Sequence, residues 1–533
     1  MHRILILTTA VGGLLLQSAC AANQPDGARG PVAEAGNQRA DKKAFSDPWF
    51  DAGQAALAAR MAIKPNTRKA RNVILFVADG MDPTTVAAAR IFDGQSRGED
   101  GEENLLSFER FPHLAMAKTY TTDAQTPDSA GTMSAMATGV KTKSGVLSVT
   151  DAVVRGDCAS GLAAVAPTIG ELAEQAGMAT GVISTARLTH ATPAAVFAHA
   201  ADREWEADRL MSEEDRAAGC IDIARQLIEF PYGDGIDVAM GGGRANFLPT
   251  AMADPEDEGR TGGRPDGRNL AEEWTAKSNN HRVVFDKESF DRLDLDAAPR
   301  VLGLFERSHM EYEADRPSDA GGEPSLAEMT EAAIKILSKD KAGYLLVVEA
   351  GRVDHAHHAG NAARALKDAQ AFAQAVEVAR AMTKSRDTLI IATADHGHTL
   401  TFAGYPTKGN DILGLADTLY EDAPTNDDGA VLAGDGKPYT TLGYANGPGS
   451  PFVGEDNAGG GGRPALTPDA VADLDFKQQA IIPARSESHG GQDVTIYADG
   501  PHAYLFDGTV EQNYIFHVID AALDLRRRAD RRE

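Results

Sequence analysis

One hydroxyl stands between an acid and a run of small residues in the stretch QTPDSAGTMSAMATGVKT, residues 125–142. Ser129 in this stretch has two interpretations. It can cap a helix, because a serine oxygen at the N-cap accepts a hydrogen bond from a free backbone N–H of the first turn. It can also be a nucleophile toward phosphate, because a helix N-terminus gathers N–H donors and positive dipole that stabilise an anion. The stretch is compatible with both, so other residues must decide.

The sequence DHAHH, residues 354–358, opens a predicted helix and has the spacing of metal ligands. Residues four apart share one face of a helix, so Asp354 and His358 can reach the same cation. A histidine cluster at a helix start is otherwise a solvated polar end. Further acids and histidines elsewhere in the chain favour the interpretation as metal ligands.

Other acids and histidines stand at the ends of apolar segments. Asp395 and His396 close an apolar run, where a charged pair has no core role unless it is coordinated or paired. Asp79 and Glu349 also end apolar runs, and His489 lies in a polar loop. Oxygen and nitrogen ligands without thiolates suit zinc and magnesium. These residues therefore predict a metal site.

Alternating strands and helices must position these groups. The apolar run NVILFVAD (72–79) predicts a buried strand, and Asp82 and Pro83 predict the N-cap and first residue of the helix that follows. Further strands are predicted at 179–185, 343–351 and 387–396, and helices at 169–177, with Thr168 and Glu171 as a capping box, and from about 354 to 381. This alternation predicts an α/β fold with a mostly parallel central sheet and helices on both faces. Ligands bind such folds at the carboxyl ends of the strands, where the acids named above fall.

The C-terminal region departs from this alternation. Residues 409–482 are rich in Gly, Pro and Asp and predict a loop-rich insertion. Residues 493–506 then predict a β-hairpin, and residues 514–525 a closing helix.

The composition, with 42% hydrophobic and 24% charged residues, is that of a soluble globular protein. A net charge of −26 argues against a nucleic-acid-binding surface, because phosphate backbones are bound by clustered Lys and Arg. If the substrate is an anion, a local cation must offset this field. Bound metals would supply that charge.

The N-terminus has a basic start, an apolar stretch and then small residues, so residues 1–22 predict a secretory signal that is too short to span a membrane. The protein is therefore expected to be exported, to a periplasm or to the outside of the cell. Cleavage has two alternatives: an ordinary A-x-A site, which we favour, or lipoprotein processing with a lipid anchor at Cys20. Residues 23–45 predict a flexible lead-in, and residues 46–533 a single catalytic domain that includes the insertion.

Five motifs in order show that the chain resembles the alkaline phosphatases, particularly the branch that includes the animal enzymes. The similarity runs from about Pro48 to the final helix. The motifs are PDSAGT (127–132), HATPA (190–194), VEAGRVDHAHH (348–358), TADHGH (393–398) and SHGGQDV (488–494).

The resemblance implies a secreted phosphomonoesterase that hydrolyses small phosphate monoesters through a phosphoserine, at a site with two zinc ions and one magnesium ion. Its roles, carried onto matching positions, are Ser129 as nucleophile; Arg203 as the holder of two phosphate oxygens; Asp354, His358 and His489 at the first zinc; Asp79, Asp395 and His396 at the second; Asp79, Thr192 and Glu349 at the magnesium; and His190 and His355 beside that ion. With these partners in place, Ser129 is interpreted as a nucleophile placed where a cap would be.

The resemblance also implies features remote from the chemistry. Cys158 and Cys220 match a disulfide pair, which export permits; the alternative is two buried thiols. A calcium site would use Glu256, the Phe305 carbonyl, Glu306 and Glu323, unless these are ordinary surface acids. A homodimer is expected, with residues 46–62 as a helix that reaches the partner or packs on its own subunit.

The chain departs from the family pattern at ADGMD (78–82), where GDGMG is common, and at Ala350, where the family has glycine. Asp82 either adds charge to the site or caps a helix, and we favour the cap because Pro83 follows it. Two other functions remain as alternatives: a two-metal phosphodiesterase or sulfatase on the same sheet, and an inactive secreted metal-binding protein.

Overall fold

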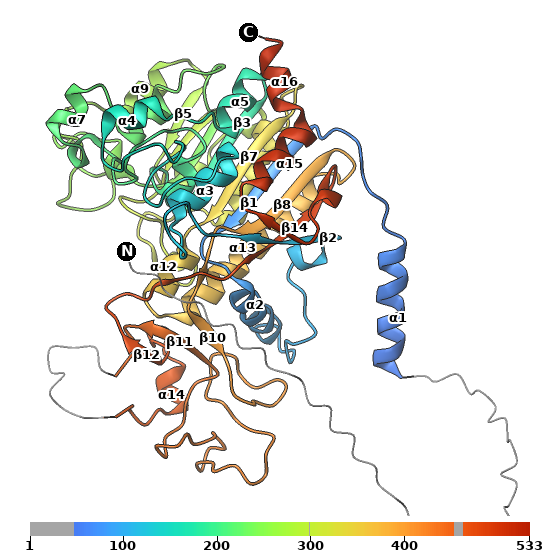
Figure 1. The fold of residues 1–533 in the computed structure, drawn as a ribbon. Helices are drawn as coiled ribbons and strands as arrows, with labels where there is room; N and C mark the ends of the chain where they lie inside the picture. The colour runs from blue at the N-terminus through green and yellow to red at the C-terminus, as the bar shows by residue number, and fades with distance from the viewer. Residues whose placement is uncertain (1–46, 298, 452–461, 533) are drawn as a thin grey trace, which may run out of the picture. The chain divides into compact units, whose positions relative to one another are not determined.

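The computed structural model describes residues 47–297, 299–451 and 462–532. It consists of two units, Met1–Ala62 and Ile63–Glu533. The larger unit is built on a ten-stranded sheet with the order β15-β2-β14-β8-β1-β7-β3-β4-β6-β5 (Figure 1). The predicted signal at residues 1–22, with Cys20, and the predicted lead-in at residues 23–45 lie outside the described residues.

The sheet is parallel from β8 to β5, and β14 is antiparallel to both of its neighbours, β8 and β2. The prediction of a mostly parallel central sheet is confirmed. Its strands are β1 (Asn72–Ala78), β2 (His113–Lys118), β3 (Ala179–Arg187), β4 (Val238–Gly242), β5 (His281–Val284), β6 (Arg300–Leu304), β7 (Tyr344–Ala350), β8 (Thr388–Ala394), β14 (Val494–Asp499) and β15 (Thr509–Glu511).

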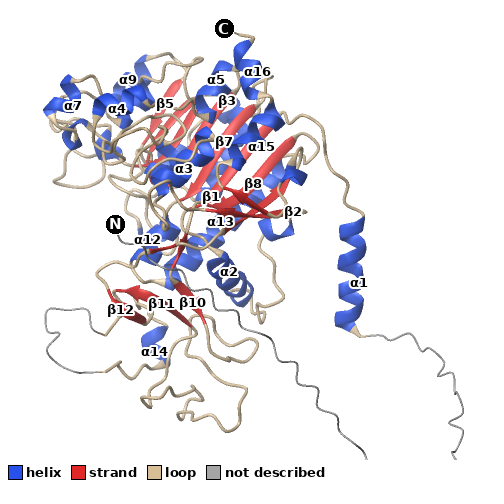
Figure 2. Ribbon diagram, in the orientation of Figure 1, coloured by secondary structure: helices blue, strands red, loops and turns tan. Residues whose placement is uncertain are grey.

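Two groups of helices cover the sheet (Figure 2). The first group packs together and against β1, β3 and β7: α2 (Pro83–Gln95), α11 (Leu326–Leu337) and α13 (Ala362–Met382). The second group contacts the same strands and includes α3 (Ser129–Thr138), α5 (Ile169–Gln175), α6 (Ala191–Ala194) and α15 (Tyr514–Leu523). The remaining helices are α4 (Cys158–Ala163), α7 (Glu213–Ala217), α8 (Ile223–Ile228), α9 (Leu270–Ala276), α10 (Lys287–Asp291), α12 (Arg352–His358), α14 (Pro468–Val471) and α16 (Leu525–Asp530).

Local sequence signals account for several element boundaries. Asp82 caps α2, because its Oδ1 accepts the Thr85 N–H at 2.8 Å, as predicted. The predicted capping box of Thr168 and Glu171 opens α5. Gly360, with φ of +68°, ends the turn after α12, so the predicted helix is divided into α12 and α13.

The predicted hairpin at residues 493–506 is wrong. Strand β14 uses both of its edges, toward β8 and β2, so neither edge is free to pair with a following strand. Residues 503–505 instead form a 3₁₀ turn. The predicted disulfide is present and joins Cys158 at the start of α4 to Cys220.

The described part of residues 409–482 contains strand β11 (Leu442–Gly447), helix α14, the start of strand β12 (Ala480–Pro483) and long loops. These two strands and β10 (Leu400–Phe402) form a separate three-stranded sheet. In the described part of the chain, none of the helices has the length and apolar composition to cross a membrane.

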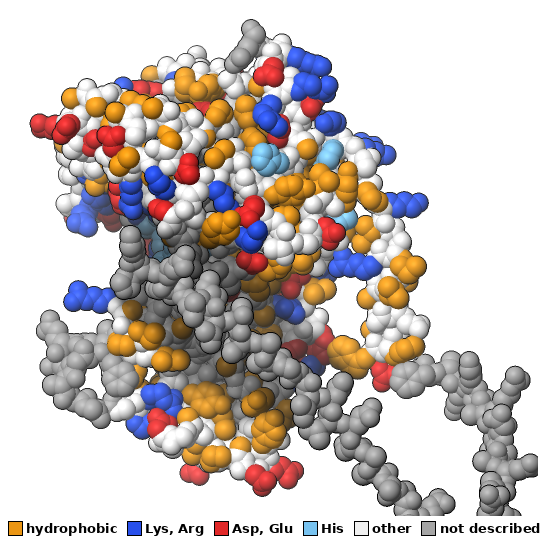
Figure 3. Space-filling model, in the orientation of Figure 1, with side chains coloured by type: hydrophobic (Ala, Val, Ile, Leu, Met, Phe, Trp, Pro, Cys, Tyr) orange, Lys and Arg blue, Asp and Glu red, His pale blue; other side chains and the backbone are white. Residues whose placement is uncertain are grey.

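Helix α1 (Pro48–Met61) belongs to the smaller unit, and none of its residues is buried. Asp47 caps it through the N–H groups of Trp49 and Phe50. Trp49 is 71% exposed and Met61 79% exposed. Figure 3 shows apolar side chains along this helix, whereas basic and acidic side chains are intermixed over the visible face of the larger unit.

Candidate active site

Strand register brings three acids to one edge of the sheet. Ala78 in β1 lies opposite Ala350 in β7 and Ala394 in β8, so Asp79, Glu349 and Asp395 are neighbours at the carboxyl ends of these strands. All three side chains are fully buried. Burial, and then the charge of Asp79, raises the pKa of Glu349 well above its ordinary value and that of Asp395 to about 7. Such a cluster needs protons or cations.

Ser129 faces this cluster from the start of α3. Its Oγ lies 3.3 Å from Asp79 Oδ2 and 3.2 Å from His396 Nε2. The residue that caps α3 is Asp128, whose Oδ1 accepts the Gly131 N–H at 3.1 Å. Ser129 is therefore the first residue of the helix and does not occupy the cap position expected from the sequence. Its hydroxyl is not used as the cap and faces Asp79 and His396 at a helix N-terminus.

Two histidine rings face each other beside Asp354. His358 Nδ1 lies 2.5 Å from the Glu487 carbonyl oxygen, and His489 Nδ1 lies 2.8 Å from the Pro127 carbonyl oxygen. Because a carbonyl only accepts, each Nδ1 carries a proton, and in the neutral rings each Nε2 holds a lone pair.

Those two Nε2 atoms are 3.0 Å apart, and each is 3.3 Å from Asp354 Oδ1. Lone pairs and a carboxylate that converge in this way repel one another unless a proton or a metal cation lies among them. Burial alone would lower the pKa of His489, but Asp354 raises it. Backbone carbonyls that fix the tautomer are also the usual partners of metal-binding histidines. The residues predicted for the first zinc, Asp354, His358 and His489, therefore fit a zinc ligand set.

A second group lies directly beside Ser129. Asp79, Asp395 and His396 place their ligand atoms within 4.8 Å of one another. Burial lowers the pKa of His396 to about 3, so its ring is neutral and its Nε2 has a lone pair to offer. These are the residues predicted for the second zinc.

A third group contains oxygens that lack partners. Among the described residues, Glu349 Oε1, Thr192 Oγ1 and His190 Nδ1 are buried without a hydrogen bond. Asp79, His190 and Glu349 also form a group whose ligand atoms lie within 4.8 Å of one another. The Arg203 Nη2 group donates to His190 Nε2 at 3.1 Å, so the neutral ring carries its proton on Nδ1. His190 is thus a donor toward this group and lies beside it.

Two further histidines surround His190. The His355 ring centroid lies 5.6 Å from that of His190, and His309 lies 4.1 Å from His355. Burial lowers the pKa of His355 to about 3, so this predicted neighbour of the third group is neutral.

Arg203 lies next to Ser129 through Asp128. Its Nη1 donates to Asp128 Oδ2 at 3.0 Å, on the residue that precedes Ser129. Burial alone would raise the pKa of Asp128, but Arg203 and the N–H groups of Gly131 and Gly145 outweigh it, and the pKa is lowered. The resulting ion pair holds the guanidinium fork in place, and such a fork can bind two oxygens of one phosphate.

Sequence reasoning assigned no role to two residues of the site, His398 and Glu487. His398 Nε2 lies 2.8 Å from Asp354 Oδ1, and its Nδ1 lies 2.6 Å from Glu487 Oε2. Burial alone would lower the pKa of His398, but these two carboxylates raise it to about 10. The sequence does contain a signal for both residues. His398 stands two positions after the predicted ligand His396, and Glu487 stands two positions before the predicted ligand His489. Residues two positions apart lie on the same side of an extended chain.

The predicted calcium residues lie in an acidic cluster away from Ser129. Glu256, Glu306 and Asp319 place their carboxylate oxygens within 4.8 Å of one another. Glu323 adjoins them: burial, and then Glu306 and Asp319, raises its pKa to about 9. Asp319 is therefore a carboxylate that the sequence reasoning did not include.

The Phe305 carbonyl, also predicted as a calcium ligand, accepts a hydrogen bond from Arg244 Nη1 at 2.9 Å. The same buried guanidinium donates to Glu256 Oε2 at 2.8 Å. Arg244 therefore offsets part of the negative charge of the cluster. A carbonyl has two lone pairs, so this hydrogen bond leaves one available to a cation.

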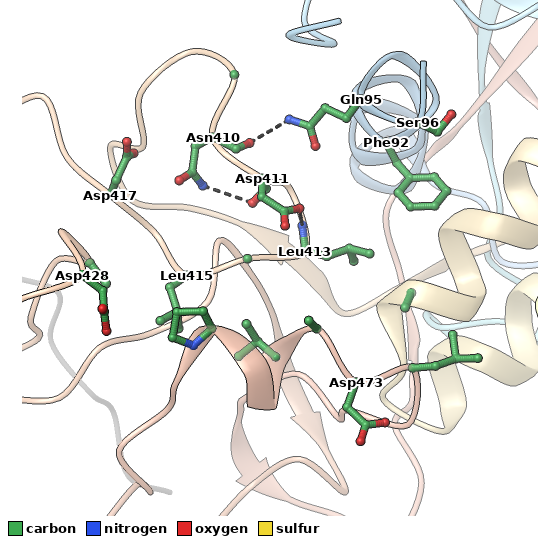
Figure 4. A pocket seen from close by; sticks show the side chains of 18 of the residues that line it. Phe92, Gln95, Ser96, Asn410, Asp411, Leu413, Leu415, Asp417, Asp428 and Asp473 are labelled. Carbon is green, nitrogen blue, oxygen red and sulfur yellow. Dashed lines mark hydrogen bonds between the residues drawn. The ribbon is translucent and has the colours of Figure 1, made fainter. Parts of the chain in front are cut away.

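A cavity of about 1000 Å³ lies apart from these groups, between α2, α13 and the insertion (Figure 4). Phe92, Leu413 and Leu415 contribute apolar side chains to it, and Gln95 donates to the Asn410 carbonyl at 2.8 Å. Its lining includes none of the predicted metal ligands. The chemistry therefore belongs to the strand ends and not to this cavity.

A sequence profile described as "Alkaline phosphatase" matches residues 70–525. The chain belongs to the alkaline phosphatase family. It is 42% identical to the tissue-nonspecific alkaline phosphatase isozyme of Felis catus over 478 residues, which cover 88% of this chain and 87% of that relative. It is 41% identical to an alkaline phosphatase of Gadus morhua over 484 residues, which cover 88% and 95% of the two chains.

The fold agrees with solved alkaline phosphatases. The crystal structure of the Thermus thermophilus enzyme has a TM-score of 0.61 at 24% identity, covering 87% of this chain and 93% of that chain. The structure of the enzyme from the Antarctic bacterium TAB5 has a TM-score of 0.56 at 21% identity, covering 86% and 99%. The resemblance inferred from the motifs is confirmed, and the protein is a phosphatase of phosphate monoesters.

The stability gained from bound metal should grow as the pH rises from about 5 to 8, around the raised pKa of Asp395. In the metal-free fold that pKa is raised to about 7, whereas the unfolded carboxyl keeps an ordinary value near 4. The contribution of Asp395 to metal-free stability is thus present below about pH 4 and lost as the pH rises through about 7. Bound cations favour the ionised carboxylate and should restore that loss.

Melting temperatures of the metal-stripped enzyme and of the enzyme reloaded with zinc and magnesium, measured across this range, check the prediction. The difference between the two forms should widen with pH. A constant difference, or one that narrows, would contradict the proposed electrostatics of the site.

Proposed function

We propose that the protein is an exported, metal-dependent alkaline phosphatase that hydrolyses phosphate monoesters through a phosphoserine at Ser129. The observation that carries the proposal is the position of the Ser129 hydroxyl. It lies at a helix N-terminus, within 3.4 Å of Asp79 and His396 and beside the Arg203–Asp128 ion pair. A phosphate held by Arg203 would meet this hydroxyl.

The donor sets fit two zinc ions and one magnesium ion. Asp354, His358 and His489 would hold one zinc, and Asp79, Asp395 and His396 the other. Asp79, Thr192 and Glu349 offer only oxygen, which suits magnesium, and His190 turns a protonated nitrogen toward them. Bound cations of this kind screen the phosphate dianion, lower the pKa of nearby hydroxyl groups and stabilise the entering and leaving oxygens.

The residues of the chain carry two successive displacements. Ser129 Oγ forms a bond to phosphorus as the bond from phosphorus to the substrate oxygen breaks, and the alcohol leaves with the proton that the serine hydroxyl gives up. A water oxygen then forms a bond to phosphorus as the bond to Ser129 Oγ breaks, and one proton of the water returns to the serine, which yields inorganic phosphate and the free hydroxyl. Arg203 orients two phosphate oxygens in both steps, and Asp128 keeps its guanidinium in place.

The alternative functions have less support. Diesterases and sulfatases on the same sheet lack the combination of Arg203, Thr192 and Glu349, and the sequence around Ser129 lacks the C/S-x-P-x-R context of sulfatases. An inactive metal-binding protein would not need a buried serine beside the ligands whose hydroxyl is not used to cap its helix. Turnover of a phosphate monoester, a diester and an aryl sulfate, with and without a chelator, separates the three.

The proposal also covers the cellular compartment and the oligomeric state of the enzyme. We infer export to a periplasm or to the outside of the cell, with residues 1–22 as the signal and either ordinary cleavage or a lipid anchor at Cys20. The disulfide between Cys158 and Cys220 agrees with an oxidising compartment. We also infer a homodimer, in which the exposed apolar side chains of α1 would be covered by the partner.

We propose calcium at the acidic cluster, held by Glu256, Glu306 and Asp319, with Glu323 beside them and the Phe305 carbonyl as a further oxygen. Burial, and then Glu256 and Asp319, raises the pKa of Glu306 to about 8, so the cluster lacks sufficient positive charge of its own. Calcium accepts six to eight oxygens in flexible geometry, and waters would complete the shell.

Ser129→Ala should lose roughly a thousandfold or more in monoester turnover and should retain its metals, because only the nucleophilic oxygen is removed. Ser134→Ala is the matched control on the same helix, since the hydrogen bonds of Ser134 Oγ join Val146 and Ser148 and none of the proposed ligands. Acid-quenched enzyme, analysed by peptide mass spectrometry, should contain phosphate on residues 125–142 in the wild type and in the control. Near-normal turnover of Ser129→Ala would remove the serine from the mechanism.

Calcium added to metal-stripped enzyme that has regained zinc and magnesium should raise the melting temperature by roughly 3 °C at a hundredfold excess over Kd. Turnover should be unchanged, because the cluster is remote from Ser129. Glu306→Gln should abolish the shift, whereas Glu331→Gln, on the exposed side of α11, should keep it. Equal stabilisation of both variants, or no stabilisation of the wild type, would sink the calcium site.

A further inference from the structure

Two very short strands carry histidines of the proposed metal centre. Strand β9 (Gly397–His398) pairs antiparallel with β13 (His489–Gly490), and His398 lies opposite His489. We call this pair the β9–β13 ladder. It holds one proposed zinc ligand, His489, and the ring that donates to the ligand Asp354. A ladder of two residues per strand is too short to be stable alone, so its position depends on what it contacts.

The turn after β1 contacts this ladder on one side. Gly80 has φ of +73°, and a Cβ atom on it would lie 2.4 Å from the ring of His398. The absence of a side chain at Gly80 therefore lets the ring pack directly on the turn. The same turn carries Asp79 at its start and the fully buried Asp82 at its end.

Asp82 reaches the ladder through Gln492. One of its oxygens caps α2, and the other, Oδ2, accepts a hydrogen bond from Gln492 Nε2. That nitrogen also donates to the His398 carbonyl at 2.7 Å. Both hydrogens of one amide are thus used, one on a buried carboxylate and one on the backbone of the ladder.

The Gln492 amide lies against both glycines of the ladder. A Cβ atom on Gly397 would lie 2.6 Å from Gln492 Nε2, and a Cβ atom on Gly490 would lie 2.0 Å from Gln492 Oε1. Any side chain at either position would displace the amide. The two glycines, the amide and the carboxylate therefore form one packed unit between the ladder and the turn.

We propose that Asp82 and Gln492 are positioning residues that fix the β9–β13 ladder against the turn after β1, and thereby set His398 and His489 relative to Asp79. The inference rests on the proposed metal centre. Neither residue supplies a ligand atom or contacts the substrate. Their expected effect is to slow the loss of zinc from the site, because the ligand His489 can leave the metal only if the ladder moves.

Three variants of the zinc-loaded enzyme test the inference: Asp82→Asn, Gln492→Glu and the combination of both. Asp82→Asn leaves one oxygen to cap α2 but turns a donor toward the donor of Gln492. Gln492→Glu places two carboxylates together. The combined variant again opposes a donor to an acceptor at this contact, although it does not restore the hydrogen bond to the His398 carbonyl. Asp157→Asn is the control, because Asp157 caps the remote helix α4 through Ser160.

The measurement is the rate constant for zinc transfer from the holoenzyme to a chromogenic chelator. Each single variant should lose zinc about tenfold faster than the wild type, which is the effect of one hydrogen bond to a charged group. The zinc-loss rate constant of the combined variant should be at least about threefold smaller than the value expected if the two single increases simply multiplied. The control should match the wild type, and the rate should rise in both single variants whatever the melting temperatures of their metal-stripped forms.

Zinc-loss rates equal to that of the wild type in both single variants would overturn the inference. It would also be overturned if the two single effects simply multiplied in the combined variant. A lower melting temperature of metal-stripped Asp82→Asn with an unchanged rate would also overturn it, because Asp82 would then only cap the helix. Gln492→Glu keeps the test decisive if Asp82→Asn fails to fold, since Gln492 lies on an exposed turn. A wild type that binds no zinc would overturn the proposed metal centre itself.

Discussion

Buried negative charge at the carboxyl edge of the sheet is the constraint on which the rest of the site depends. The register of β1 with β7 and β8 places Asp79, Glu349 and Asp395 together where water cannot reach them. The neighbouring His396 is neutral, so it offsets none of this charge and offers a lone pair instead. Divalent cations satisfy both requirements, since they neutralise the carboxylates and accept the lone pairs. The chain belongs to the alkaline phosphatase family, which hydrolyses phosphate monoesters.

Much of this edge could be predicted from the sequence because Asp79, Glu349 and Asp395 each end an apolar run, and parallel strands meet at their carboxyl ends. Supporting residues were harder to predict. Glu487 and His398 act on Asp354, which is far from either in sequence, so only the folded chain shows the contact. Asp82 was predicted as a helix cap, but its second oxygen binds Gln492, which is 410 positions away.

Some features of the fold can likewise be predicted from local sequence patterns, and others depend on contacts between residues far apart in the sequence. The alternation of strands and helices predicts the parallel core, and capping residues such as Thr168 mark where helices begin. The position of β14 between β8 and β2 depends instead on which sheet edges are left free after the core has formed, and periodicity does not encode that choice. The acidic cluster shows the same limit, because Asp319 joins it through a loop whose path the sequence does not define.

The most direct test of this account is the metal content of the purified enzyme, measured by elemental analysis together with turnover of a chromogenic phosphate monoester. The account predicts two zinc ions and one magnesium ion per active chain, loss of turnover when a chelator removes them, and recovery when they are returned. Full turnover by protein that holds no divalent metal would contradict it. Something other than a metal would then neutralise the buried carboxylates and separate the opposed histidine lone pairs.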